Sequence, residues 1–156
     1  MTVNDVMTAV AVKLGELFPD RLVYDKAIEQ AADGQHYVRC IEQTHGKLLD
    51  RRRSRSYSFE VLYFRKDNDP EEFNAWAETM YMEFETLTLA DGQILRVTGA
   101  SATDGDDMVF HFTFDVTFTV LLDPGAGDPM ERLDISTFEK SEAVLGTFIV
   151  DVSRLA

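Results

Sequence analysis

The sequence has 156 residues, 45% hydrophobic and 11% aromatic, and this composition predicts one folded domain rather than a disordered chain. Its formal net charge of -13 argues against general nucleic-acid binding, because such binding depends on a basic surface. No apolar run approaches the ~20 residues that a membrane span needs, no secretory signal is expected, and Cys40, the single cysteine, excludes an internal disulfide.

The first element expected is an amphipathic helix from Val3 to Phe18. Thr2 or Asn4 is suited to cap its start, and Pro19 ends it because proline disfavours the helical state of the preceding residue. Apolar residues recur at helical spacing along one face: Val3, Val6, Met7, Val10, Leu14, Leu17 and Phe18. Such a face predicts that the helix packs against another part of the fold.

The residues after this helix predict two extended segments. Residues 21–28 and 36–44 are expected to form strands, with turn residues at 31–34 between them. The sequence His-Gly-Lys at 45–47 is expected to break the second strand.

A third strand is expected at 51–64, where the side chains alternate with a period of two. One face of this strand consists of Arg51, Arg53, Arg55, Tyr57, Phe59, Val61 and Tyr63. Arg52 lies on the opposite face, which is mostly serine up to Ser58. The strand therefore has an apolar end at 59–64 and a polar end, and we expect the polar end to project beyond the core.

A second helix is expected to begin after Asp69. Asp69 is a good N-cap, Pro70 suits the first helical position, and Glu72 stands where it would complete a capping box. An apolar stripe follows at helical spacing: Phe73, Trp76, Ala77, Met80, Tyr81 and Phe84. We expect this helix, too, to pack against the rest of the fold through its apolar face.

The remaining segments predict more antiparallel sheet. Residues 86–99 are expected to form a hairpin that turns at Asp91-Gly92, residues 103–107 a turn, and residues 108–122 a long strand. One face of the long strand is almost entirely phenylalanine and valine, and the other is half polar. The predicted fold is therefore α+β, a mainly antiparallel β-sheet with two amphipathic helices packed on one face.

The predicted domain organisation is a core at 1–122 followed by a linker and C-terminal extension at 123–156. Within the extension, residues 130–135 and 144–152 are candidate strands. Because they have no evident partners in the core, we expect the extension to contact a neighbouring subunit or another protein of the same assembly.

Catalytic, cofactor and metal sites are not predicted. His36, His45 and His111 do not stand at metal-ligand spacing, and each is better explained as a solvated or hydrogen-bonded histidine. Cys40, on a strand, is expected to be a small buried residue rather than a nucleophile. No residue constellation supports an enzyme.

The arginine cluster Arg51, Arg53 and Arg55 is the most unusual feature of so acidic a chain. It has three interpretations: a nucleic-acid patch, a solvated strand end without a function, or a protein interface. The interface is favoured, because guanidinium groups bind carboxylates bidentately and other copies of the chain supply many carboxylates. A head-to-tail contact of this kind can close into a ring.

The order of elements, with "LFPD" after the first helix, "RRRSRSYSFEVLYFRKDN" on the third strand and "PEEFNAWAETMYMEFETL" on the second helix, resembles the phage tail terminator proteins. The resemblance is to a family of phages and prophages of Gram-positive bacteria and covers Val3 to Leu122. "DGQILRVTG" and "VFHFTFDVTFTV" complete the pattern. The fold that the resemblance implies is also α+β.

The resemblance implies a structural role in the virion, after assembly in the host cytoplasm. Such proteins form a ring, usually hexameric, at the head-proximal end of the tail tube, where the ring stops tube polymerisation and offers a docking surface to the head-tail connector protein. The subunit or tail-tube interface is then expected at Arg51, Arg53, Arg55 and Tyr57. The alternative is a dimeric, non-enzymatic binding or assembly-chaperone domain with an arginine-lined anion site.

Genome DNA would pass through the lumen of such a ring without specific binding. The net charge of -13 supports this expectation, because carboxylates in the lumen repel phosphates. We therefore expect no binding of duplex DNA at low salt in a gel-shift experiment, and tight binding there would contradict the expectation.

Overall fold

The chain forms two helices and six strands within the residues that the structure, a computed structural model, describes: 1–24, 33–65, 67, 69–105 and 108–124. In chain order the elements are α1 (Val3–Leu17), β1 (Val23–Tyr24), β2 (His36–Lys47), β3 (Arg52–Phe64), α2 (Pro70–Glu83), β4 (Thr86–Thr88), β5 (Ile94–Asp104) and β6 (Val109–Leu121). None of the helices in this part of the chain is long and apolar enough to cross a membrane.

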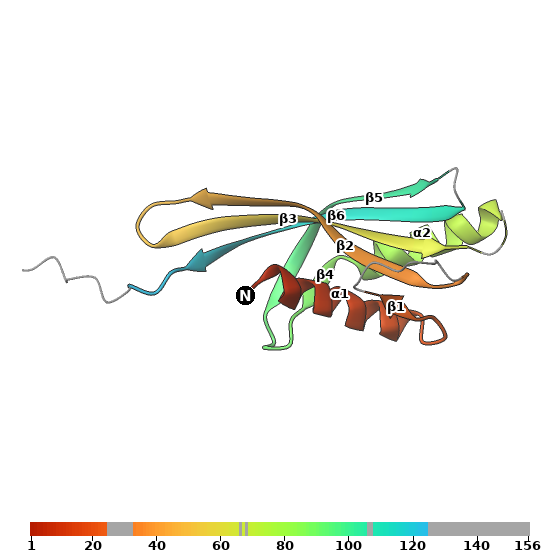
Figure 1. The fold of residues 1–156 in the computed structure, drawn as a ribbon, viewed down its shortest axis with the longest axis horizontal. Coiled ribbons are helices and arrows are strands. Elements are labelled where there is room, and N and C mark those ends of the chain that lie inside the picture. Colours follow the sequence, from red (N-terminus) through yellow and green to blue (C-terminus); the bar gives the residue numbers. More distant parts are fainter. Residues whose placement is uncertain (25–32, 66, 68, 106–107, 125–156) are drawn as a thin grey trace, which may run out of the picture. The chain divides into compact units, whose positions relative to one another are not determined.

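The strands form one sheet in the order β1-β2-β3-β6-β5-β4 (Figure 1). All neighbours are antiparallel except β1 and β2, which are parallel. The central pair, β3 and β6, is in register along its whole length, from Arg52 opposite Leu121 to Phe64 opposite Val109. The predicted α+β class with a mainly antiparallel sheet is thus confirmed.

Local capping explains where the two helices begin. Thr2, not Asn4, caps α1: its hydroxyl accepts a hydrogen bond from the Asp5 amide, and the Asp5 carboxylate accepts one from the Thr2 amide at 2.6 Å. In α2 the Asp69 carboxylate accepts from the Glu71 amide at 3.0 Å. The capping box predicted for Glu72 is wrong, because its carboxylate accepts a hydrogen bond from the Tyr63 hydroxyl at 2.7 Å.

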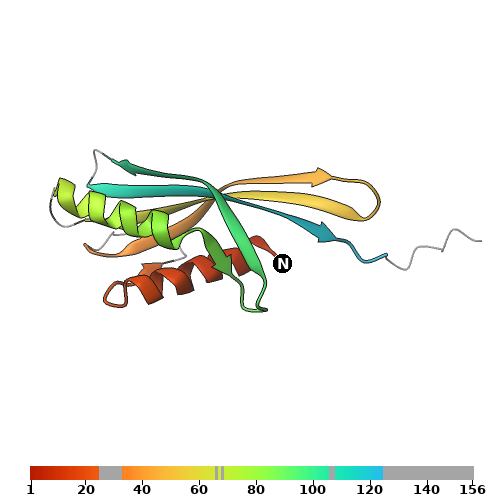
Figure 2. The same ribbon diagram turned by 180° about the vertical axis from the view of Figure 1, so that it is seen from behind.

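The core lies on the aromatic face of β3 and β6. Cross-strand pairs there include Phe59 with Phe114 and Val61 with Phe112, and the rings of Phe59 and Phe114 are stacked 5.6 Å apart. Both helices bury apolar residues in this one cluster: Val6, Val10 and Leu14 from α1, Trp76 and Met80 from α2. Figure 2 shows α2 lying across the sheet.

His36 is fully buried in this core, although the sequence predicts only a solvated or hydrogen-bonded histidine. Its ring stacks on those of Phe18 and Tyr63, and its Nε2 accepts a hydrogen bond from Trp76 Nε1 at 3.2 Å. The proton of the neutral ring is therefore on Nδ1. Burial, with the nearby Arg21 guanidinium, lowers the pKa of His36 from its ordinary value of 6.5 to about 3.

Two strand boundaries predicted from local turn residues are wrong. β2 continues to Lys47, with Gly46 opposite Ser54, so residues 45–47 are not a break. β5 continues through Gly99 to Asp104, so the predicted turn at 103–107 begins later. In both cases hydrogen bonding to a neighbouring strand outweighs the local preference of the residues, because strand propensity depends on context.

Gly99 is accommodated in β5 by a bulge between Thr98 and Ser101. Its φ is +62°, and a Cβ atom at this position would lie 2.8 Å from Asp115 Oδ2 on β6. Glycine is therefore needed here both for its backbone conformation and for the close approach of the carboxylate. Asp115 also accepts a hydrogen bond from the Ser58 hydroxyl, so it is a structural residue on the polar face of the sheet.

Two of the predicted segments lie wholly or partly outside the described residues. Of the strand expected at 21–28, residues 23 and 24 form β1, while 25–28 lie outside the described residues. Nearly all of the extension at 123–156, with its candidate strands at 130–135 and 144–152, also lies outside them. The division into a core and an extension therefore stays a prediction.

Candidate subunit interface on the projecting arm

A three-stranded arm extends from the sheet beyond the helices. Pairing between β5 and β6 ends at Val97 and Val116, whereas β2, β3 and β6 remain paired further along. We call residues 44–56 and 117–122 the arm, which Figure 1 shows extending past the start of α1. The prediction that the polar end of the 51–64 strand projects from the core is confirmed.

The tip of the arm is an apolar turn. The Leu48 amide donates to the Arg52 carbonyl at 3.1 Å, and Asp50 takes a positive φ of 61° between them. Turn residues are usually polar or glycine, yet Leu49 is 81% exposed and Leu121, beside the tip on β6, is 60% exposed. Leu48 and Leu122 are also exposed. Exposed leucines gathered at one end of a projecting element are typical of a contact surface.

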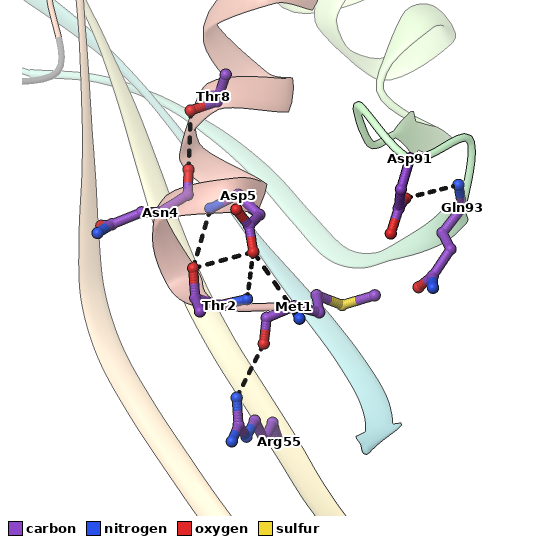
Figure 3. Close-up of polar contacts among 8 residues, drawn as sticks. All are labelled: Met1, Thr2, Asn4, Asp5, Thr8, Arg55, Asp91 and Gln93. Carbon is purple, nitrogen blue, oxygen red and sulfur yellow. Dashed lines mark hydrogen bonds and ion pairs between the residues drawn. The ribbon is translucent and has the colours of Figure 1, made fainter. Parts of the chain in front are cut away.

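The predicted arginines lie beside this tip, and each makes hydrogen bonds within its own subunit. Arg51 donates to the Leu122 carbonyl at 3.3 Å, and Arg53 donates to the Arg52 carbonyl at 2.8 Å. Arg55 is half-buried and donates to the Met1 carbonyl at 3.0 Å, which ties the base of the arm to the start of α1 (Figure 3). A guanidinium has five N–H donors, so these bonds leave most donors of Arg51 and Arg53 for a partner.

Tyr57 occupies a different position from the arginines. Its side chain is only 2% exposed and packs edge-on against Phe118, with ring centroids 5.5 Å apart. The His45 ring lies 5.8 Å away on β2. Within the subunit, Tyr57 therefore anchors the three strands of the arm to one another, and its predicted place in the interface stays a prediction.

An ion-paired cluster lies on the other face of the sheet. Glu60 on β3 is 8% exposed and accepts hydrogen bonds from Arg39 Nε at 2.6 Å and from His111 Nδ1 at 2.9 Å. Burial raises the pKa of the Glu60 carboxyl, but the hydrogen bonds from His111 and Arg39 outweigh burial and lower it overall. Glu60 therefore stays ionised and holds β2, β3 and β6 together.

The described part of the chain supplies little for catalysis or metal binding. It contains no group of three or more histidine, cysteine, aspartate or glutamate side chains that could hold a metal ion. Cys40 is half-buried rather than buried, and its thiol donates to the Glu42 carbonyl at 3.3 Å. Burial raises the pKa of this thiol, which makes it a poor nucleophile at neutral pH.

Two features of the site are missed by sequence reasoning. The exposed leucines at 48–49 and 121–122 belong to distant segments of the chain, and only the β3–β6 register brings them together. A signal was present, because two consecutive leucines beside a basic run are unusual for a turn. The Arg39–Glu60–His111 cluster has no local signal, since its members lie on three different strands.

The fold and the arm define an α+β domain with a projecting three-stranded arm whose tip exposes leucines beside arginines. In a comparison with protein families, the family described as "Phage tail terminator protein" matches residues 5–127. The match covers well over half of the chain, which therefore belongs to the phage tail terminator family and is a component of phage tails. Comparison with curated proteins found no match.

Proposed function

We propose that the chain forms a ring, hexameric by the family resemblance, on the head-proximal end of the tail tube. There the ring ends tube polymerisation and presents a docking surface to the head-tail connector protein. Its work is structural and needs no catalytic residue, and the acidic chain keeps genome DNA from binding in the lumen. Membership of the tail terminator family supports this proposal.

The arm is the observation that carries the proposal. A three-stranded element that ends in exposed leucines beside arginines leaves apolar surface uncovered in the isolated subunit. Natural proteins keep such surfaces for contacts with partners. A contact between the arm of one copy and a different surface of the next is heterologous, and repetition of such a contact closes a ring.

Purified tail tubes provide the direct test. Labelled protein is incubated with tubes and imaged by electron microscopy. We expect label at one end of each tube and an end to further growth when free tube subunits are added. Label along the tube wall, or continued elongation of labelled tubes at both ends, would contradict the proposed capping role.

A further inference from the structure

We propose that the arm tip of one subunit docks in a groove of a second copy, formed by α1 and the turn between β4 and β5. This inference rests on the proposed ring and names the surface that receives the arm. It commits to a second copy of this chain as the occupant, rather than to the tube or connector protein.

The groove consists of two adjoining hollows. The larger, of about 320 Å³, lies along the middle of α1, and the smaller, of about 210 Å³, lies at the start of α1. Both are lined by Thr8, Leu89 and Ala90. Figure 3 shows the start of α1 facing the β4–β5 turn, with Asp5 on one side and Asp91 on the other.

The floor and wall of the groove are apolar. Ala9 and Leu89 are buried at its base, while Val12, which lines the larger hollow, is 55% exposed. Covering a valine this exposed on the side of a helix is favourable, because it removes apolar surface from water. The exposed Leu48 and Leu49 at the arm tip offer an apolar surface of the matching kind.

The charges of the two surfaces are complementary. Asp5, Glu16 and Asp91 are exposed carboxylates in the lining of the groove. Of the two cations among the lining residues, Lys13 donates to the Thr86 carbonyl at 2.7 Å and the Met1 amino group lies 3.9 Å from Asp5 Oδ2, so both are directed to groups of their own chain.

The arm tip carries the opposite sign. Lys47 stands opposite Arg53 across the β2–β3 pair, and Arg51 precedes the strand. Basic groups around exposed leucines thus face a groove with an apolar floor and an acidic rim. Complementarity of this kind steers docking and fixes its register.

The arm cannot reach the groove of its own subunit. Arg55 contacts Met1 beside the smaller hollow, and the tip at Asp50 lies five residues further along the hairpin. At about 3.3 Å per residue, the tip is therefore about 17 Å beyond this contact. Because the arm is hydrogen-bonded across three strands, it does not fold back, and the groove must receive the tip of another copy.

Disulfide trapping tests the docking. In a Cys40→Ala background, Leu49→Cys on the tip is combined with Ala90→Cys in the groove, and the protein is oxidised on tail tubes. We expect most of the protein to shift from monomer to a ladder of covalent oligomers on non-reducing gels. The matched control combines Leu49→Cys with Met82→Cys, a position on α2 that is 68% exposed. We expect the control to stay monomeric.

Mixing experiments test the direction of the contact. Leu49→Asp disables only the tip and Ala90→Lys only the groove, so each variant alone is expected to remain monomeric. Together they retain one working tip and one working groove, and we expect a heterodimer that does not grow further.

Two results would overturn the inference in different ways. If wild-type rings form but the Leu49→Cys and Ala90→Cys protein gives no ladder, the arm docks elsewhere and the ring proposal stands. If the wild-type protein neither forms rings nor decorates tube ends, the ring proposal fails and this inference fails with it.

Discussion

The double variant Arg51→Glu with Arg53→Glu is expected to stay folded and to lose ring assembly. Both side chains lie on the arm, outside the aromatic core, and in the subunit Arg51 makes one hydrogen bond and Arg53 two, all to main-chain carbonyls. Loss of such bonds costs about 1 kcal/mol each, which a domain of this size tolerates. We therefore expect circular dichroism and the cooperative unfolding transition to be preserved.

Assembly is expected to respond much more strongly than folding. Each reversal replaces an attraction by a juxtaposition of like charges at the subunit contact, which costs several kcal/mol. This corresponds to a loss of about 30-fold or more in affinity at each subunit contact. Every contact around a ring is the same, so the loss of affinity acts at each contact and disfavours the whole ring. We therefore expect monomers by sedimentation velocity and bare tube ends by electron microscopy.

Arg52 offers the matched control for this prediction. Arg52→Glu introduces the same charge change as Arg53→Glu at the neighbouring position, but the strand alternation directs the two side chains to opposite faces. We expect Arg53→Glu alone to weaken assembly and Arg52→Glu to leave it nearly unchanged. Rings that survive the double reversal, or equal effects of the two single variants, would remove the arginine face from the interface.

A second large effect is expected from His36 as the solution is acidified. Its folded-state pKa of about 3 lies below the unfolded value of 6.5, so the unfolded chain binds more protons between these values. The stability that neutral His36 provides is fully present above pH 6.5 and is lost as the pH falls toward 3. The expected slope is about 1 kcal/mol per pH unit.

Urea unfolding between pH 7 and pH 5 separates His36 from most carboxyl groups, which titrate at lower pH. His36→Gln removes the titration while keeping an acceptor for Trp76 Nε1, so we expect a smaller slope of stability against pH. The overall stability also falls, because the stacking on Phe18 and Tyr63 is lost. His45→Gln, on the exposed arm, is the control and is expected to keep the wild-type slope. An unchanged slope in His36→Gln would show that another group is responsible.

Docking of the arm in the groove of a neighbouring copy would explain why so acidic a chain carries one basic cluster. The acidic surface of one copy would supply the partner for the basic cluster of the next copy. The carboxylates at the groove rim, such as Asp5 and Asp91, would then face the basic arm tip of the next copy, unlike carboxylates elsewhere on the surface. Salt is accordingly expected to weaken assembly, since screening acts on charges at the rim of an interface.

Much of the architecture follows from the sequence because its causes are local. The N-caps at Thr2 and Asp69 and the apolar stripes of both helices depend on residues within a few positions of one another. The alternation along β3 and β6 reflects the two-residue repeat of any strand, so the aromatic face and the projecting polar end are also predictable. These patterns are enough for the α+β class.

The tertiary structure decides what depends on partners distant in sequence. Strand pairing carries β2 past Gly46 and β5 past Gly99, against their local preferences. It also sets the Glu60 cluster, the burial of His36, and the meeting of Leu48 and Leu49 with Leu121 at the arm tip. The sequence by itself determines that Arg51, Arg53 and Arg55 share a face. Only the tertiary structure shows that Arg55 is tied to Met1, whereas Arg51 and Arg53 lie beside an exposed apolar tip.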